Sequence, residues 1–165
     1  MSGARNIAWA PLALLALLTL GLAGAATAAT VCTVSALPVA FGVYSPTAAS
    51  AHTSTGSVSV VCQPVLASAI QTYTLTLSTG GSGSYAMRRL SASGHTLNYQ
   101  LYKDAAYAAV WGDGSSGTSS LSGTLSLSVL LPVSATHTVY GRMPALQSGA
   151  YAGSYLDTIT VTVTY

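Results

Sequence analysis

The feature that most constrains this chain is a strict alternation of apolar and hydroxyl-bearing side chains. From Thr158 to Tyr165 every second residue is threonine, and the residues between are apolar or aromatic. Serine or threonine alternates with apolar residues in the same way over residues 57–60, 73–78 and 124–129. Successive side chains of a β-strand point to opposite faces, so each run forms one apolar and one polar face. The pattern therefore predicts half-buried β-strands, which threonine and valine also favour.

Shorter apolar runs predict further strands at residues 31–36, 39–44, 97–102, 108–111 and 138–143. Pro38 separates the first two, and because proline cannot donate to a ladder, we expect the chain to bend or change partner there. Turn-forming residues gather between the runs, at 45–47, 78–84, 112–120 and 149–153. No amphipathic helix stands out. Many short strands at close spacing predict one all-β domain, an antiparallel β-sandwich.

The amino-terminal segment has the features of a secretory signal peptide. Arg5 supplies positive charge, residues 12–22 are apolar, and Ala26-Thr27-Ala28 forms an A-x-A cleavage site. Cleavage before Ala29 divides the chain into a signal peptide, residues 1–28, and a single domain, residues 29–165. Cleavage after Ala25 or one residue later than predicted also fits. A retained anchor is the alternative, because the apolar stretch is almost long enough to span a bilayer.

Charged residues are scarce in the predicted mature domain. It holds four cationic residues and three aspartates, a formal net charge of +1. No basic patch is available, so we expect no nucleic-acid partner. Half of the chain is hydrophobic, which distinguishes it from the charged composition of disordered chains.

The two cysteines, Cys32 and Cys62, both follow the predicted signal peptide. Exported chains meet an oxidising environment, so the default prediction is a disulfide between the first two strands. Closing a loop of about thirty residues stabilises a fold by roughly 3–4 kcal/mol. Two separate buried thiols are the alternative.

Groups suited to catalysis or metal binding are few. The chain has three aspartates, no glutamate and three histidines, with no H-x-x-x-H motif or Cys/His cluster. Residues 112–117 match G-x-G-x-x-G, but they form a Ser/Gly loop without the strand and helix that a dinucleotide site requires. We therefore predict no enzymatic activity, no cofactor and no metal.

Tyrosine dominates the aromatic residues, with ten tyrosines against one phenylalanine. Tyrosine-rich surfaces bind sugars or proteins, because the ring stacks and the hydroxyl forms hydrogen bonds. Tyr73, Tyr99 and Tyr165 fall at strand positions that can face the core instead. The sequence favours core or surface filling over a dedicated binding patch.

An ordered set of segments carries a family resemblance: residues 31–34, 39–44, 56–62, 97–104, 111–114, 149–151 and 155–165. With this set, the chain from Val31 to Tyr165 resembles the spore coat protein U family. Members of that family include subunits of archaic chaperone–usher pili.

The resemblance implies an immunoglobulin-like sandwich that is incomplete, with its final strand supplied in trans. In such pilins a periplasmic chaperone fills the gap first, and the amino-terminal extension of another pilin subunit then replaces it. The implied partners are the chaperone, an outer-membrane usher and other pilin subunits. The implied route leads through the periplasm to a fimbrium on the cell surface. A missing strand leaves an apolar groove and an unpaired edge.

The run from Thr158 to Tyr165 would border the missing strand. We expect Ile159, Val161, Val163 and Tyr165 to line the acceptor groove, with the threonines facing outward.

The segment ahead of Cys32 departs from the pattern of an ordinary shaft subunit. A donor strand needs roughly ten alternating residues, whereas cleavage before Ala29 leaves only three. This predicts a subunit that accepts a strand without donating one, as at a fibre tip. A misread start or cleavage site, or a member that works outside fibres, is the alternative.

The leading functional hypothesis is a structural subunit of an adhesive pilus, assembled by a donor-strand mechanism. One alternative is a spore or cell coat protein of the same fold. The other is a carbohydrate-binding module that uses the tyrosines.

Overall fold

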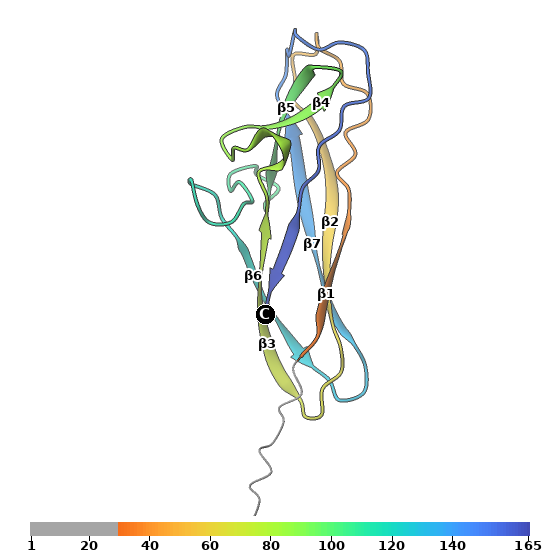
Figure 1. The fold of residues 1–165 in the computed structure, drawn as a ribbon, viewed down its shortest axis with the longest axis vertical. Coiled ribbons are helices and arrows are strands. Elements are labelled where there is room, and N and C mark those ends of the chain that lie inside the picture. The colour runs from red at the N-terminus through yellow and green to blue at the C-terminus, as the bar shows by residue number, and fades with distance from the viewer. Residues whose placement is uncertain (1–29) are drawn as a thin grey trace, which may run out of the picture.

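The computed structural model describes residues 30–165, which fold as two antiparallel β-sheets (Figure 1). One sheet has the strand order β1-β2-β7-β5-β4 and the other the order β6-β3-β8. The bounds are β1 Cys32–Leu37, β2 His52–Cys62, β3 Ala69–Leu77, β4 Arg88–Ala92, β5 His95–Tyr102, β6 Leu121–Leu127, β7 Val133–Met143 and β8 Val161–Thr164, with a 3-10 helix, η1, at Gly80–Ser82. The predicted all-β antiparallel class is confirmed. The predicted signal peptide, residues 1–28, lies outside the described residues.

The core lies between the two sheets and comes from the alternating runs. Val58 and Val60 of β2 and Leu75 and Leu77 of β3 are almost fully buried, while their Ser and Thr neighbours are more exposed. Each strand thus buries one row, as its two-residue period requires. Trp111, also fully buried, donates its indole N–H to the Leu75 carbonyl over 3.2 Å.

The expected strand at residues 39–44 is wrong: these residues form no strand. After Pro38 the chain crosses the inner face of the larger sheet at two glycines. A Cβ on Gly56 would lie 2.9 Å from Val39 Cγ2, and one on Gly141 would lie 2.8 Å from Phe41 Cζ. The glycines allow this close approach, so Val39 and Phe41 pack as core residues instead of pairing in a sheet.

Other boundaries also differ from those expected. Residues 108–111 make only isolated bridges, because the chain from 103 to 120 folds back on itself. Strand β4 has no apolar alternation to reveal it: it begins with two arginines, of which Arg88 is fully buried. Strand β8 covers Val161–Thr164, half of the predicted run.

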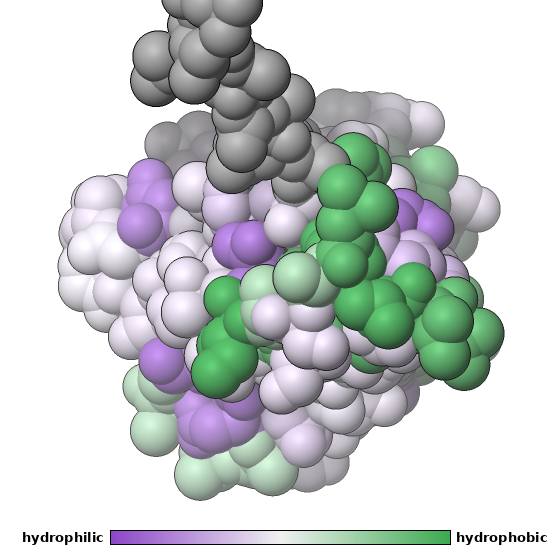
Figure 2. Space-filling view, turned by 90° about the horizontal axis from the view of Figure 1, so that it is seen from below, coloured by the Kyte–Doolittle hydropathy of each residue, from purple (hydrophilic) through white to green (hydrophobic). Residues whose placement is uncertain are grey.

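Large aliphatic residues gather at the lower pole of the molecule, where the β2–β3 and β6–β7 connections turn (Figures 1 and 2). We call this surface the apolar pole, and it comprises Leu66, Ile70, Val129, Leu130 and Leu131, which are between 47% and 88% exposed. None of the described residues forms a helix with the length and apolarity needed to cross a membrane.

Candidate functional site

The candidate site is an apolar groove between the free edges of β1 and β8. Each of these strands ends its sheet: β1 pairs with β2 and β8 pairs with β3. Among the described residues, no strand pairs with the other edge of either. Edges of this kind carry backbone N–H and C=O groups that can accept a further strand.

The groove has a volume of about 250 Å³ and is lined from both sheets. Ile159 and Val161 form one side, beside Leu77 of β3. Val58 and Leu101 of the larger sheet contribute to its floor. Nearly all of the lining is aliphatic or aromatic, so an occupant gains by burying apolar side chains there.

The four predicted groove residues do not share one environment. Ile159 and Val161 line the groove, and both are half-buried. Val163 is half-buried against the core but does not line this cavity, and Tyr165 is 47% exposed. The threonines at 158, 160, 162 and 164 are all exposed, so the expected alternation holds along the segment.

A second hollow continues from the upper end of the groove. It has a volume of about 830 Å³ and lies between residues 38–46 and 150–157. Val39, Phe41, Leu90 and Asp157 line both cavities. The groove residues predicted from the sequence do not include those of this second hollow, because the sequence predicts a strand at Val39 and Phe41.

Asp157 fixes the point at which the chain enters the groove wall. Its Oδ2 accepts a hydrogen bond from the Tyr99 hydroxyl over 2.6 Å, and its Oδ1 accepts the Gly81 N–H over 2.8 Å. Burial and the hydrogen bond to Asp157 raise the pKa of Tyr99 well above its usual range. The phenol therefore stays protonated and keeps donating. These bonds tie the segment before β8 to β5 and to η1.

Arg88 supports the groove from behind, and the sequence did not reveal it. The fully buried guanidinium donates to the carbonyls of Ser78 and Trp111 over 2.8 Å each, and to Gln100 Oε1 over 2.6 Å. Burial lowers the pKa of Arg88, and the nearby Tyr99, Tyr85 and Asp157 act in the opposite direction. A buried charge is tolerated when its donors are satisfied, so Arg88 holds β4, β5 and the Trp111 loop together.

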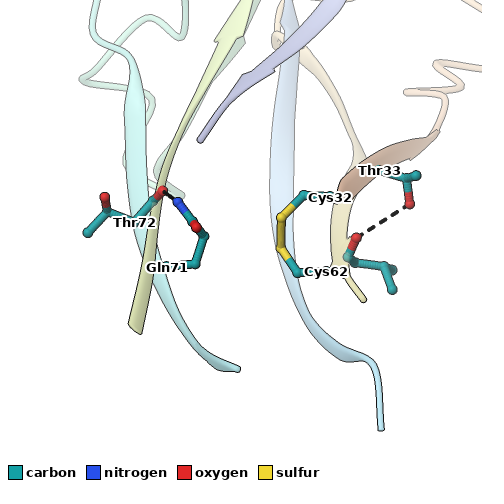
Figure 3. Close-up of a disulfide and its surroundings, with 6 residues drawn as sticks. Cys32, Thr33, Cys62, Gln71 and Thr72 are labelled. Atoms are coloured by element: carbon teal, nitrogen blue, oxygen red, sulfur yellow. Dashed lines mark hydrogen bonds between the residues drawn. A yellow bond between two sulfur atoms is a disulfide. The ribbon is translucent and has the colours of Figure 1, made fainter. Parts of the chain in front are cut away.

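The predicted disulfide between Cys32 and Cys62 is present in the structure (Figure 3). These two residues are directly opposite in the β1–β2 register. The Thr33 hydroxyl adds a 3.4 Å hydrogen bond to the Val61 carbonyl beside it. Because β2 is the only strand within residues 30–165 that pairs with β1, the disulfide secures the lower end of this groove wall.

No group of three or more His, Cys, Asp or Glu within the described part of the chain is placed to hold a metal ion. His137 makes a 2.7 Å hydrogen bond with the Tyr73 hydroxyl, and burial lowers the pKa of its imidazole.

The groove itself presents one carboxylate, that of Asp157, which already accepts hydrogen bonds from Tyr99 and Gly81. Its geometry suits the binding of an extended apolar segment.

Comparison with known proteins places this geometry in context. The Spore Coat Protein U domain model matches residues 17–162. No curated protein matches the sequence significantly. A solved structure with a similar fold is that of the CsuC–CsuE chaperone–tip adhesion subunit pre-assembly complex from archaic chaperone–usher Csu pili of Acinetobacter baumannii. The match has 20% identity and a TM-score of 0.51, and it covers 83% of this chain but only 40% of the matched one.

Proposed function

The chain belongs to the Spore Coat Protein U domain family, and from this premise we propose that it is a structural subunit of a bacterial surface pilus assembled by a donor-strand mechanism. The observation that carries the proposal is the apolar groove with an unpaired strand edge on each side. A strand laid between β1 and β8 would hydrogen-bond to both edges and bury every second side chain. The fold shared with a chain of a chaperone–subunit complex supports this reading.

The occupants of the groove change during assembly under this proposal. A periplasmic chaperone supplies the strand first, and the amino-terminal extension of another subunit replaces it in the fibre. Ile159 and Val161 contact the incoming strand, and Val163 and Tyr165 extend the contact downward. The proposal includes export of residues 29–165, release of a signal peptide, passage through an outer-membrane usher and a final location on the cell surface.

A tip position is the narrower form of the proposal. It follows from the predicted cleavage site and is tested by sequencing the amino terminus of the exported protein. An amino terminus at Ala29 keeps the tip prediction. An amino terminus well upstream of Ala29 removes its basis.

The proposal is tested by co-expressing the chain with a candidate periplasmic chaperone. Val161→Asp places a carboxylate inside the groove, where burying an unpaired charge costs roughly several kcal/mol. Thr162→Asp is the matched control, because Thr162 follows Val161 on β8 and its side chain is exposed. We expect the wild type and Thr162→Asp to purify as a complex with the chaperone, and Val161→Asp to be degraded.

Equal recovery of the complex with both variants would contradict the proposed groove. Thermal unfolding of Thr162→Asp and of any Val161→Asp protein that escapes degradation, followed by circular dichroism, separates loss of binding from loss of folding.

A further inference from the structure

A second arrangement of side chains stands on the outer face of the larger sheet, away from the groove. In the β5–β7 register Tyr102 is opposite Tyr140, and Gln100 is opposite Arg142. Residues directly opposite in an antiparallel pair share a face. The intervening Leu101 and Gly141 belong to the inner face and are buried. The Tyr and Arg side chains therefore point away from the core.

The loop that follows β5 is folded so that an aromatic ring covers this face. The Asp104 carboxylate accepts the backbone N–H groups of Ala106, Ala108 and Ala109 over 3.1, 3.1 and 2.7 Å. These bonds lower the pKa of Asp104 and keep it ionised. One side chain thus organises the whole turn around Tyr107.

Tyr107 sits in this turn with a φ of 56°, in the left-handed region that a bulky residue seldom adopts. Its ring meets those of Tyr102 and Tyr140 edge to face, with centroids 5.5 and 6.4 Å apart. Non-glycine residues in this region persist only where the surroundings hold them, and they gather at binding sites.

Arg142 joins this aromatic cluster to a hollow in the surface. Its guanidinium carbon lies 5.5 Å from the centre of the Tyr107 ring, a cation–π contact that restrains an otherwise exposed side chain. Arg142 and Tyr102 also line a hollow of about 460 Å³, whose walls include Met87, Val110 and Pro144. An arginine beside the Tyr107 ring, the Tyr102 side chain and apolar walls therefore border one open space.

We propose that this hollow binds a sugar residue that carries a carboxylate, such as a uronic or sialic acid. A planar guanidinium forms two parallel hydrogen bonds with a carboxylate. The Tyr102 side chain lines the hollow, and a tyrosine ring offers a pyranose both an apolar face and a hydroxyl group. The site is separate from the groove and does not depend on the donor-strand proposal. Of the clustered tyrosines, Tyr102 lines the hollow, and Tyr107 packs against Tyr102 and Tyr140.

The test uses titration calorimetry with the exported, disulfide-bonded protein. The probes are trigalacturonic acid and 3′-sialyllactose, which present the carboxylate on two kinds of sugar, and the methyl ester of each. Arg142→Gln removes the charge at the site, and Arg89→Gln is the matched control, because Arg89 is an exposed arginine outside the cluster. Tyr107→Leu retains apolar volume over the sheet but loses the aromatic ring.

We expect the wild-type protein to bind at least one of the two acids, and to bind the methyl ester of that acid at least tenfold more weakly. The Arg142→Gln variant should also bind the acid at least tenfold more weakly than the wild type does. Arg89→Gln should bind as the wild type does, and Tyr107→Leu should reduce affinity without loss of the folded state in circular dichroism. Binding of only one of the two acids identifies the source of the carboxylate. No binding of either acid at millimolar concentration, or equal binding of acid and ester, overturns the proposal. Wild-type affinity in Arg142→Gln overturns it as well.

Discussion

The groove and the apolar pole both expose aliphatic side chains, but they differ in whether their backbone N–H and C=O groups are already hydrogen-bonded. At the pole, the backbone N–H groups are used locally: Val65 donates to the Ser128 carbonyl over 3.1 Å, and Leu130 donates to the Ser128 hydroxyl over 3.1 Å. In the groove, each wall is a strand with one unpaired edge. The pole therefore offers apolar area alone, whereas the groove offers apolar area and hydrogen-bonding groups in a repeating line.

This difference shows why exposed hydrophobicity is a weak guide to function in this chain. Apolar contact has no direction, so the pole cannot specify the conformation of a partner. A strand edge specifies an extended partner and its register, because each backbone group needs a counterpart.

The largest effect is expected from placing a charge in each region in turn. Ile159→Asp puts a carboxylate in the groove and should abolish capture by a chaperone, since burying it costs several kcal/mol, on the order of 100-fold or more in affinity. Leu131→Asp changes a pole residue that is 69% exposed and should leave capture intact. Affinity purification with a tagged chaperone measures both. Loss of capture in Leu131→Asp would remove the distinction between the two regions.

Removing the disulfide should weaken the groove wall more than the pole. The double variant Cys32→Ser, Cys62→Ser releases a loop with a sequence separation of 30. The expected loss in the free energy of unfolding is roughly 3–4 kcal/mol. Urea denaturation checks the value, with the reduced wild-type protein as the control. A loss below about 1 kcal/mol would mean that β1 holds its place through hydrogen bonds alone.

Asp157→Asn tests how firmly the upper end of the groove is fixed. The change weakens the charge-assisted bonds from Tyr99 and Gly81, so we expect a loss of about 1–2 kcal/mol in the free energy of unfolding. Asp113→Asn is the control, because that carboxylate is exposed and accepts hydrogen bonds from the Ser115 N–H and hydroxyl in its own turn. Both variants are measured by urea denaturation. An equal effect at the two positions would contradict a special role for Asp157.

The smallest effect on stability is expected at the pole. Replacing Leu130 and Leu131 with serine should change the free energy of unfolding by no more than about 0.5 kcal/mol, because these side chains are already 80% and 69% exposed. The same double variant should bind less of a dye that reports exposed apolar surface. A large loss of stability would show that the pole packs inward and belongs to the core.

The local pattern predicted most of the strands, because a two-residue period survives wherever one face is buried. The runs around Val58, Leu75, Leu125 and Val161 all became strands, and the disulfide joined the expected pair. The failures have a physical cause in each case. Residues 39–44 have the pattern of a strand, but glycines on two distant strands let them pack on the sheet face. Strand β4 was not predicted because it begins with the buried Arg88. No local sequence pattern distinguishes a buried charge that has hydrogen-bond partners from a charge in solvent.

Three properties of this protein follow from its sequence by itself: the all-β class, the inward and outward rows of each strand, and the pairing of its two cysteines. Each depends on local periodicity or on the small number of possible partners. Tertiary structure alone decided which strands end their sheets, that Asp157 meets Tyr99 and η1, and that Tyr107 lies over Tyr102, Tyr140 and Arg142. Asp157 and Tyr99 lie 58 positions apart along the chain, and Tyr107 lies 33 positions from Tyr140 and 35 from Arg142. Their geometry is set by how the sheets pack, and no local period encodes that packing.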